Sequence, residues 1–173
     1  EAGHPIPDSN SFLATEEAIK MVKGLSSDDK VLFLISGGGS ALFEKPLIDE
    51  KELTSLTEQL LASGADITEI NTIRKRLSAV KGGKFAKICE PAQVISVVLS
   101  DIIGDPLDMI ASGPAYPDSS TSEQALGIIR KYGITVSAQT MELLRRETPK
   151  ELNNVRTKIT GSVTQLCAAA ERT

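Results

Sequence analysis

The stretch from Val31 to Ser40, VLFLISGGGS, constrains the fold more than any other part of the chain. Val31 to Ile35 form a continuous apolar run, which is typical of a strand buried on both faces in a parallel sheet covered by helices. The three glycines that follow would each weaken a strand or a helix, so their use at this point is conformational. We therefore expect an α/β fold in which a central strand ends in a glycine turn.

The glycine turn is the first candidate binding site. Without Cβ atoms its backbone N–H groups are open to a phosphate or a carboxylate, and a helix that starts nearby strengthens such a site. A flexible linker or a tight turn is the alternative interpretation, but linkers do not usually follow a buried strand directly. The candidate ligand-binding residues in the turn are Ser36, Gly37, Gly38, Gly39 and Ser40.

Several common sites are excluded by the sequence. A Walker A loop and the dinucleotide fingerprint both need a glycine where this chain has Leu42. One histidine without a clear serine partner argues against a hydrolase triad, and the cysteines lack zinc-site spacing. Cys89 and Cys167 lie in apolar, helical patterns, which predicts buried free thiols.

Composition narrows the class of protein further. Of the 173 residues, 3% are aromatic, so the core is built from aliphatic side chains, and the net charge of −4 argues against general nucleic-acid binding. No apolar stretch is long enough to span a bilayer and no signal peptide is recognisable, so we expect a cytoplasmic protein that is not bound to membranes. The start at Glu1 rather than Met suggests a piece of a longer protein.

Hydrophobic periodicity predicts the remaining elements. The apolar run 94–99 indicates a second buried strand, and residues 155–159 a short third one. A helix is expected to start at a cap formed by Asn10 or Ser11 and to end at Gly24. Further helices are expected at about 49–63, 66–81, 121–131, 137–146 and 163–171.

The region 66–88 carries the basic cluster of the chain. Arg74 and Lys81 are seven residues apart and would share one face of an unbroken helix, although Gly82 and Gly83 should end it. A solvated cationic face is the simplest interpretation. Because the rest of the chain is acidic, we favour a cluster, including Lys75, that brings positive charge to a polyanionic ligand.

A polar loop with three acids follows the second predicted strand. Asp101, Asp105 and Asp108 lie within eight residues, and Ser112 and Gly113 come next. An acid at a strand end beside a glycine turn is where many phosphoryl-transfer proteins hold Mg²⁺. Ordinary turn chemistry also explains Asp-Pro and Pro-Asp pairs, so we favour a functional role for Asp101 and leave Asp108 and Asp118 open.

The amino-terminal segment EAGHPIPD holds the only histidine, His4. A lone histidine near a terminus is commonly solvated. The prolines that flank it stiffen this segment, so His4 and Asp8 would be held firmly if the segment packed near a site. Both interpretations stay open at this point.

Four segments resemble the glycerate 2-kinase family, which is also labelled hydroxypyruvate reductase. They are EAGHPIPD, LISGGGSAL, NTIRKRLSAVKGGKFA and LSDIIGDPLDMIASGP, in the family's order. The resemblance implies a three-layer α/β/α, Rossmann-like domain with a mostly parallel sheet and a second, smaller domain across a cleft. Residues 1–173 match the middle of the larger domain, without the upstream segment that has a lysine held to be catalytic and without the carboxy-terminal domain.

The same resemblance implies phosphorylation of D-glycerate to 2-phosphoglycerate by ATP with Mg²⁺. On this interpretation Arg74, Lys81 and Asp101 are catalytic, and Asp101 with Asp105 holds Mg²⁺. The glycine turn binds phosphate or substrate together with Lys75, Ser112, Gly113 and His4. Two alternatives remain: an NAD(P)H-dependent hydroxypyruvate reductase, and a non-catalytic anion-binding module in this shortened form. Glycerate and a nucleotide are the expected partners, and self-association into homo-oligomers is also expected.

Overall fold

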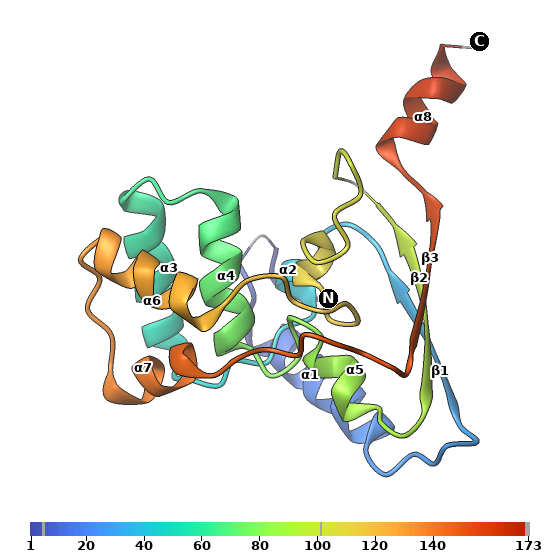
Figure 1. Cartoon of the computed structure of the whole chain (residues 1–173), viewed down its shortest axis with the longest axis horizontal. Coiled ribbons are helices and arrows are strands. Elements are labelled where there is room, and N and C mark those ends of the chain that lie inside the picture. Colours follow the sequence, from blue (N-terminus) through green and yellow to red (C-terminus); the bar gives the residue numbers. More distant parts are fainter. Residues whose placement is uncertain (5, 101, 172–173) are drawn as a thin grey trace.

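The fold is built on a sheet of three parallel strands (Figure 1). The computed structural model describes residues 1–4, 6–100 and 102–171. Strands β1 (Lys30–Ile35), β2 (Gln93–Leu99) and β3 (Val155–Gly161) lie in the order β1-β2-β3. All pairs are parallel, so the predicted α/β class and all three predicted strands are confirmed.

The helices fall into two groups (Figure 1). One group packs into a cluster beside the sheet and consists of α3 (Glu50–Ala62), α4 (Ile67–Leu77), α6 (Ser122–Lys131) and α7 (Ala138–Arg145). The other elements lie at the sheet or its ends: α1 (Ser9–Val22), α2 (Gly39–Leu42), α5 (Lys84–Ile88), the 3-10 turn η1 (Ile110–Ser112) and α8 (Val163–Ala170).

Capping residues set most helix starts, and one cap differs from the expectation. Asp8, rather than Asn10 or Ser11, caps α1, because its carboxylate accepts from the N–H of Ser11 at 3.0 Å. Ser11 in turn completes a capping box with Asp8, and a hydrogen bond to Ser11 lowers the pKa of Asp8. Asp8 is therefore occupied as a helix cap.

Each group of elements has its own apolar core. The helical cluster packs aliphatic side chains such as Leu60, Ile73 and Leu144. The sheet core joins α1 and α5 to the strands and holds the buried thiol of Cys89. The rings of Phe33, Phe43 and Phe85 pack against one another there in tilted and edge-to-face arrangements, with centroids 4.8 to 5.5 Å apart. Because Phe43 directly follows α2, this aromatic group anchors the end of the glycine turn to the sheet.

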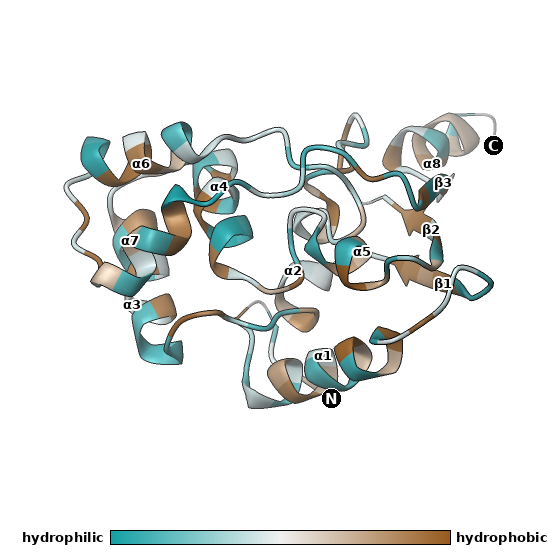
Figure 2. Ribbon diagram, turned by 60° about the horizontal axis from the view of Figure 1, so that its bottom comes forward, coloured by the Kyte–Doolittle hydropathy of each residue, from teal (hydrophilic) through white to brown (hydrophobic). Residues whose placement is uncertain are grey.

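The opposite face of the sheet is open, contrary to the expectation of strands buried on both faces. Leu32 is 63% exposed and Leu34 68% exposed. Strands β1 and β2 are nevertheless strongly apolar (Figure 2). Their outer face is exposed because the helices in the described part of the chain cover only the other face. Helix α8 has no buried residue and Cys167 on it is exposed, so the prediction of a buried thiol there is wrong.

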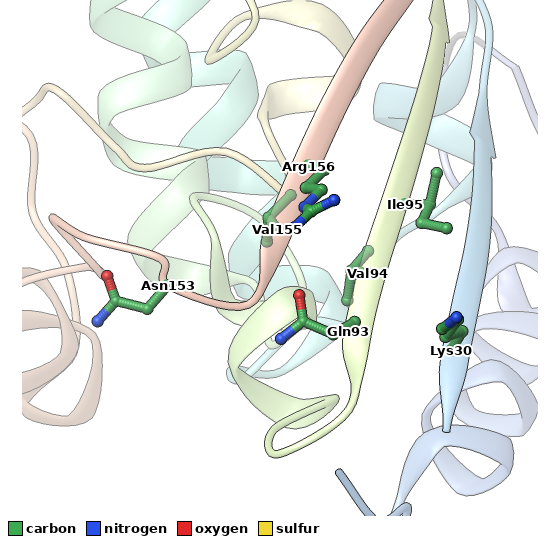
Figure 3. Close-up of a pocket in the computed structure, with 7 residues that line it drawn as sticks. All are labelled: Lys30, Gln93, Val94, Ile95, Asn153, Val155 and Arg156. Carbon is green, nitrogen blue, oxygen red and sulfur yellow. The ribbon is translucent and has the colours of Figure 1, made fainter. Parts of the chain in front are cut away.

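A hollow lies on this sheet at the amino-terminal ends of the strands (Figure 3). It has a volume of about 510 Å³ and is lined by Lys30, Gln93, Val94, Ile95, Asn153, Val155 and Arg156. Ligands of open α/β sheets bind at the carboxyl ends of the strands, so this hollow is at the wrong end for an active site. None of the helices in the described part of the chain is long and apolar enough to cross a membrane.

Candidate active site at the carboxyl end of strand β1

The glycine turn takes the form expected of an anion site. Strand β1 ends at Ile35, and Gly38, with φ of +80°, starts the short helix α2. This left-handed conformation favours glycine, which has no Cβ to clash with the backbone. Among the described residues, the backbone N–H groups from Gly37 to Ser40 have no hydrogen-bond partner. Four consecutive donors are therefore available to a ligand.

A hollow of about 170 Å³ adjoins the turn. Ser36, Gly37 and Gly39 line it together with apolar side chains, which are Phe33, Leu34, Ile35, Leu42, Phe43 and Ala111. Gly39 has no room for a side chain, since a Cβ there would lie 2.7 Å from the Cβ of Ala111. The turn is therefore pressed against the loop that follows β2, as the sequence pattern of strand ends suggested.

Arg74 and Lys81 meet at the back of the turn. Both donate to the carbonyl oxygen of Ser40, at 3.2 and 2.8 Å, and Lys81 also donates to the carbonyl of Phe43 at 3.1 Å. They do not share a helix face, because α4 ends at Leu77. The structure brings both cations to the turn, where they hold its backbone from behind.

Glu44 balances part of this positive charge. Its Oε2 lies 3.4 Å from Nζ of Lys81 and 3.9 Å from the guanidinium of Arg74. Burial lowers the pKa of Lys81 to about 8, against the opposing effect of the Glu44 charge. Two cations and one carboxylate leave a net positive charge beneath the N–H groups, which favours an anion.

The segment from Lys81 to Lys84 ties the site together. The N–H groups of Gly82 and Gly83 donate to the carbonyls of Ser112 and Gly113, at 3.0 and 2.7 Å. The ammonium of Lys84 donates to three carbonyls at the end of α4, which are those of Lys75, Arg76 and Ser78. From the sequence, Gly82 and Gly83 were expected only to break a helix, and Lys84 belonged to the basic cluster without a role at the site, although two lysines that flank a glycine pair were a usable signal.

Lys75 is buried in a second charged cluster and does not reach the turn. Its ammonium lies 3.1 Å from Oδ1 of Asp118 and 3.3 Å from Oδ2 of Asp108. Asp118 also accepts from the hydroxyl of Thr148 at 2.7 Å. Burial would raise the pKa of Asp118, but the Thr148 hydrogen bond and the Lys75 charge lower it on balance. This cluster joins α4 to the loops around residues 108 and 118.

Three other predicted site residues, His4, Ser112 and Gly113, lie at or near the glycine turn. The ring of His4 lies against Gly38, since a Cβ on Gly38 would be 3.4 Å from His4 Nε2. Ser112 is fully buried, and its hydroxyl lies 3.1 Å from that of Ser40. Gly113 is left-handed, with φ of +64°. The amino-terminal segment and the loop after β2 thus both reach the glycine turn.

The acids expected to hold a metal do not form a full set of ligands among the described residues. Asp101 lies outside the described residues. Asp105 has a buried Oδ1 with no partner in the described part of the chain. Asp108 is occupied by Lys75 and by the hydroxyl of Ser119. Within residues 1–4, 6–100 and 102–171, no group of three or more His, Cys, Asp or Glu side chains could hold a metal ion.

Comparison with known proteins gives consistent matches along the chain. Residues 1–145 match a family described as a domain of unknown function, DUF4147. The chain is 53% identical over 173 residues to a Thermotoga maritima protein named D-glycerate 2-kinase, covering 99% of this chain and 42% of that protein. It is 45% identical over 157 residues to an Agrobacterium vitis protein named putative hydroxypyruvate reductase, covering 87% and 35%.

The fold matches as well as the sequence. A crystal structure of glycerate kinase from Thermotoga maritima superposes with a TM-score of 0.95 at 52% identity, covering 99% of this chain and 42% of that one. The chain therefore spans less than half the length of the relatives that it matches.

Proposed function

The chain belongs to the DUF4147 family, and from this premise we propose that it forms part of an ATP-dependent kinase that phosphorylates D-glycerate to 2-phosphoglycerate. The observation that carries the proposal is the 53% identity, over 99% of the chain, with a protein named D-glycerate 2-kinase. The glycine turn at the carboxyl end of β1 supports it, because a phosphoryl-transfer site needs donors for an anion.

In this proposal the turn from Ser36 to Ser40 binds the phosphates of ATP or the carboxylate of glycerate. Its four unpartnered N–H groups would donate to the anion. Arg74 and Lys81 act through the Ser40 carbonyl that they hold, fixing the turn and supplying positive charge behind it. Lys75 adds a weaker field, since Asp108 and Asp118 neutralise it.

The residues around the turn complete the proposed site. Ser112 meets Ser40 through its hydroxyl, Gly113 continues the loop whose Ala111 faces Gly39, and the ring of His4 lies against Gly38. The substrate hydroxyl oxygen would form a bond to the γ-phosphorus as the bond from that phosphorus to the bridging oxygen of ADP breaks, and the hydroxyl proton would pass to solvent. Positioning and electrostatic stabilisation are the contributions expected of the protein in such a transfer.

One atom of the acidic loop suits Mg²⁺. The buried and unpartnered Oδ1 of Asp105 is a hard oxygen ligand of the kind that Mg²⁺ prefers. We assign Asp105, together with Asp101, as the candidate ligands. When bound, the ion would neutralise charge on the phosphate oxygens.

The proposal is tested with a protein of the relatives' full length that carries this chain. It should form ADP in a manner that depends on D-glycerate and Mg²⁺. The 173-residue chain alone should bind anions weakly and show no such turnover, because a kinase site needs a second wall to hold donor and acceptor and to exclude water. Oxidation of NADH with hydroxypyruvate, without ATP turnover, would favour the reductase instead.

A further inference from the structure

Three polar side chains from three separate elements form a buried chain of hydrogen bonds that ends at the glycine turn. The hydroxyls of Ser40 and Ser112 lie 3.1 Å apart, and the Ser112 hydroxyl donates to Oδ1 of Asn71 at 3.0 Å. Asn71 on α4 is 5% exposed and Ser112 is 0% exposed. No ligand contact is assigned to Asn71 by the proposed function.

The chain of hydrogen bonds has one direction. The amide nitrogen of Asn71 faces Sδ of Met109 at 3.9 Å, which leaves the amide oxygen toward Ser112. A serine hydroxyl has a single hydrogen, and Ser112 uses it on Asn71. The hydrogen between the two serines therefore belongs to Ser40, so the Ser40 oxygen can only accept from any further group.

The backbone at Ser112 is strained in a way that supports a site role. Ala111 and Ser112 are both left-handed, with φ of +50° and +61°. The hydrogen bond from Gly82 to the Ser112 carbonyl, at 3.0 Å, holds this conformation. Non-glycine residues held in such conformations cluster at functional sites.

We propose that Asn71 and Ser112 are positioning residues that fix the Ser40 hydroxyl as an acceptor toward the ligand. A ligand group that contacts the Ser40 oxygen must then carry a proton, as the alcohol of a hydroxy acid does, while anionic oxygens are left to the backbone N–H groups of the turn. This assignment rests on the proposed function only in taking the turn as the ligand site.

A matched pair of variants at Ser112 separates the hydroxyl from the backbone. Ser112→Ala and Ser112→Gly both remove the hydroxyl. Glycine also relieves the left-handed strain, so the Ser112→Gly variant should have a higher melting temperature than the Ser112→Ala variant. Amide signals of the turn glycines, read by NMR on the whole chain labelled at glycine, should shift equally in both. Glycerate affinity, measured by titration calorimetry, should fall about tenfold in both, because a buried partner is left unpaired.

Asn71 supplies the conservative rescue and Asn154 the control. Asn71→Leu should shift the turn signals, whereas Asn71→Asp keeps an acceptor for Ser112 and should restore them. Asn154 is also 5% exposed and donates to the carbonyls of Ala86 and Ala92, away from the turn. Asn154→Leu should lower the melting temperature without moving the turn signals.

The outcomes distinguish this inference from the proposed function. Wild-type turn signals and wild-type glycerate affinity in both Ser112→Gly and Asn71→Leu would overturn the positioning role. If the unmodified chain bound neither inorganic phosphate nor glycerate while the turn signals still moved in these variants, the proposed function would fail and the hydrogen-bond chain would stand.

Discussion

Two buried carboxylates bind the cations of the basic region, and they differ in how well they are satisfied. Both oxygens of Asp118 have partners, among them Lys75 at 3.1 Å and Thr148 at 2.7 Å. Glu44 faces Lys81 and Arg74 with Oε2 only, and its buried Oε1 has no partner among the described residues. The Asp118 cluster joins helices to loops, whereas Glu44 lies directly behind the glycine turn.

The unpaired oxygen of Glu44 lowers the free energy of unfolding. An unsatisfied buried oxygen costs about 1–3 kcal/mol, and natural proteins tolerate such groups mainly at functional sites. Both carboxylate oxygens of Asp118 are satisfied, although the buried Nε of the neighbouring Arg76 has no partner among the described residues. The unpaired carboxylate oxygen of Glu44 differs in its place, because it lies directly behind the proposed active site.

The largest effect is expected for Asp118→Asn. Lys75 and Arg76 would be left buried without their shared counterion, which costs about 3–5 kcal/mol of the free energy of unfolding. Urea denaturation followed by circular dichroism measures the loss. Asp28→Asn, at an exposed position, is the control and should change stability by less than about 0.5 kcal/mol. Equal losses in the two variants would remove the distinction.

Glu44→Gln should have a smaller effect on stability and a larger one on binding. The substitution removes a carboxylate that is only half used, so the expected loss is about 1–2 kcal/mol. Arg74 and Lys81 would shift at the Ser40 carbonyl, and phosphate or glycerate affinity, measured by titration calorimetry, should fall. If Glu44→Gln lost as much stability as Asp118→Asn with unchanged affinity, the two clusters would have the same role.

Two glycine substitutions should change the stability of the protein in opposite directions. Gly39→Ala places a Cβ 2.7 Å from Ala111 and should destabilise the protein by about 1–3 kcal/mol while weakening anion binding. Gly127 lies within α6, and a Cβ added there would meet no atom within 4 Å, so Gly127→Ala should stabilise by about 0.5–1 kcal/mol. Thermal unfolding of both variants checks this, and a stable Gly39→Ala variant would show that the turn can move away from Ala111.

The last prediction concerns the pH dependence of stability. Burial lowers the pKa values of Lys81 and Lys84 to about 8 from an ordinary value of 10.5. The unfolded chain therefore binds more protons between these values, and the free energy of unfolding should rise from pH 8 to 10.5. Asp118 acts at the other end, because its lowered pKa gives stability that is lost as the pH falls below about 3.8.

Urea midpoints across this pH range give the measurement. Lys81→Met should reduce the alkaline rise and leave the acid limb unchanged. A midpoint that stays flat or falls between pH 8 and 10.5 would show that neither lysine is strained by burial.

Much of the fold and the location of the candidate site were predictable from the sequence. Continuous apolar runs identified β1 and β2, because such runs are local signals, and residues 155–159 were expected to form the short third strand. The three glycines identified the turn, and the position of the acidic loop after β2 placed it at the same sheet edge. The short helix α2 was missed, since four residues carry no periodic pattern. The exposed sheet face could not be foreseen, because an apolar strand does not say which helices will cover it.

By itself, the sequence determined the parallel α/β fold and a glycine turn at the end of its first strand. Only the tertiary structure decided which cations meet that turn. Lys81 and Ser40 are 41 residues apart, as are Ser112 and Asn71, and no local pattern links them. Charge in a sequence gives the sign of a field, but burial and distance decide whether a lysine faces a ligand, a carboxylate or a carbonyl. In this protein Lys81 and Lys84 hold backbone carbonyls and Lys75 holds carboxylates, while the N–H groups of the glycine turn have no partner among the described residues.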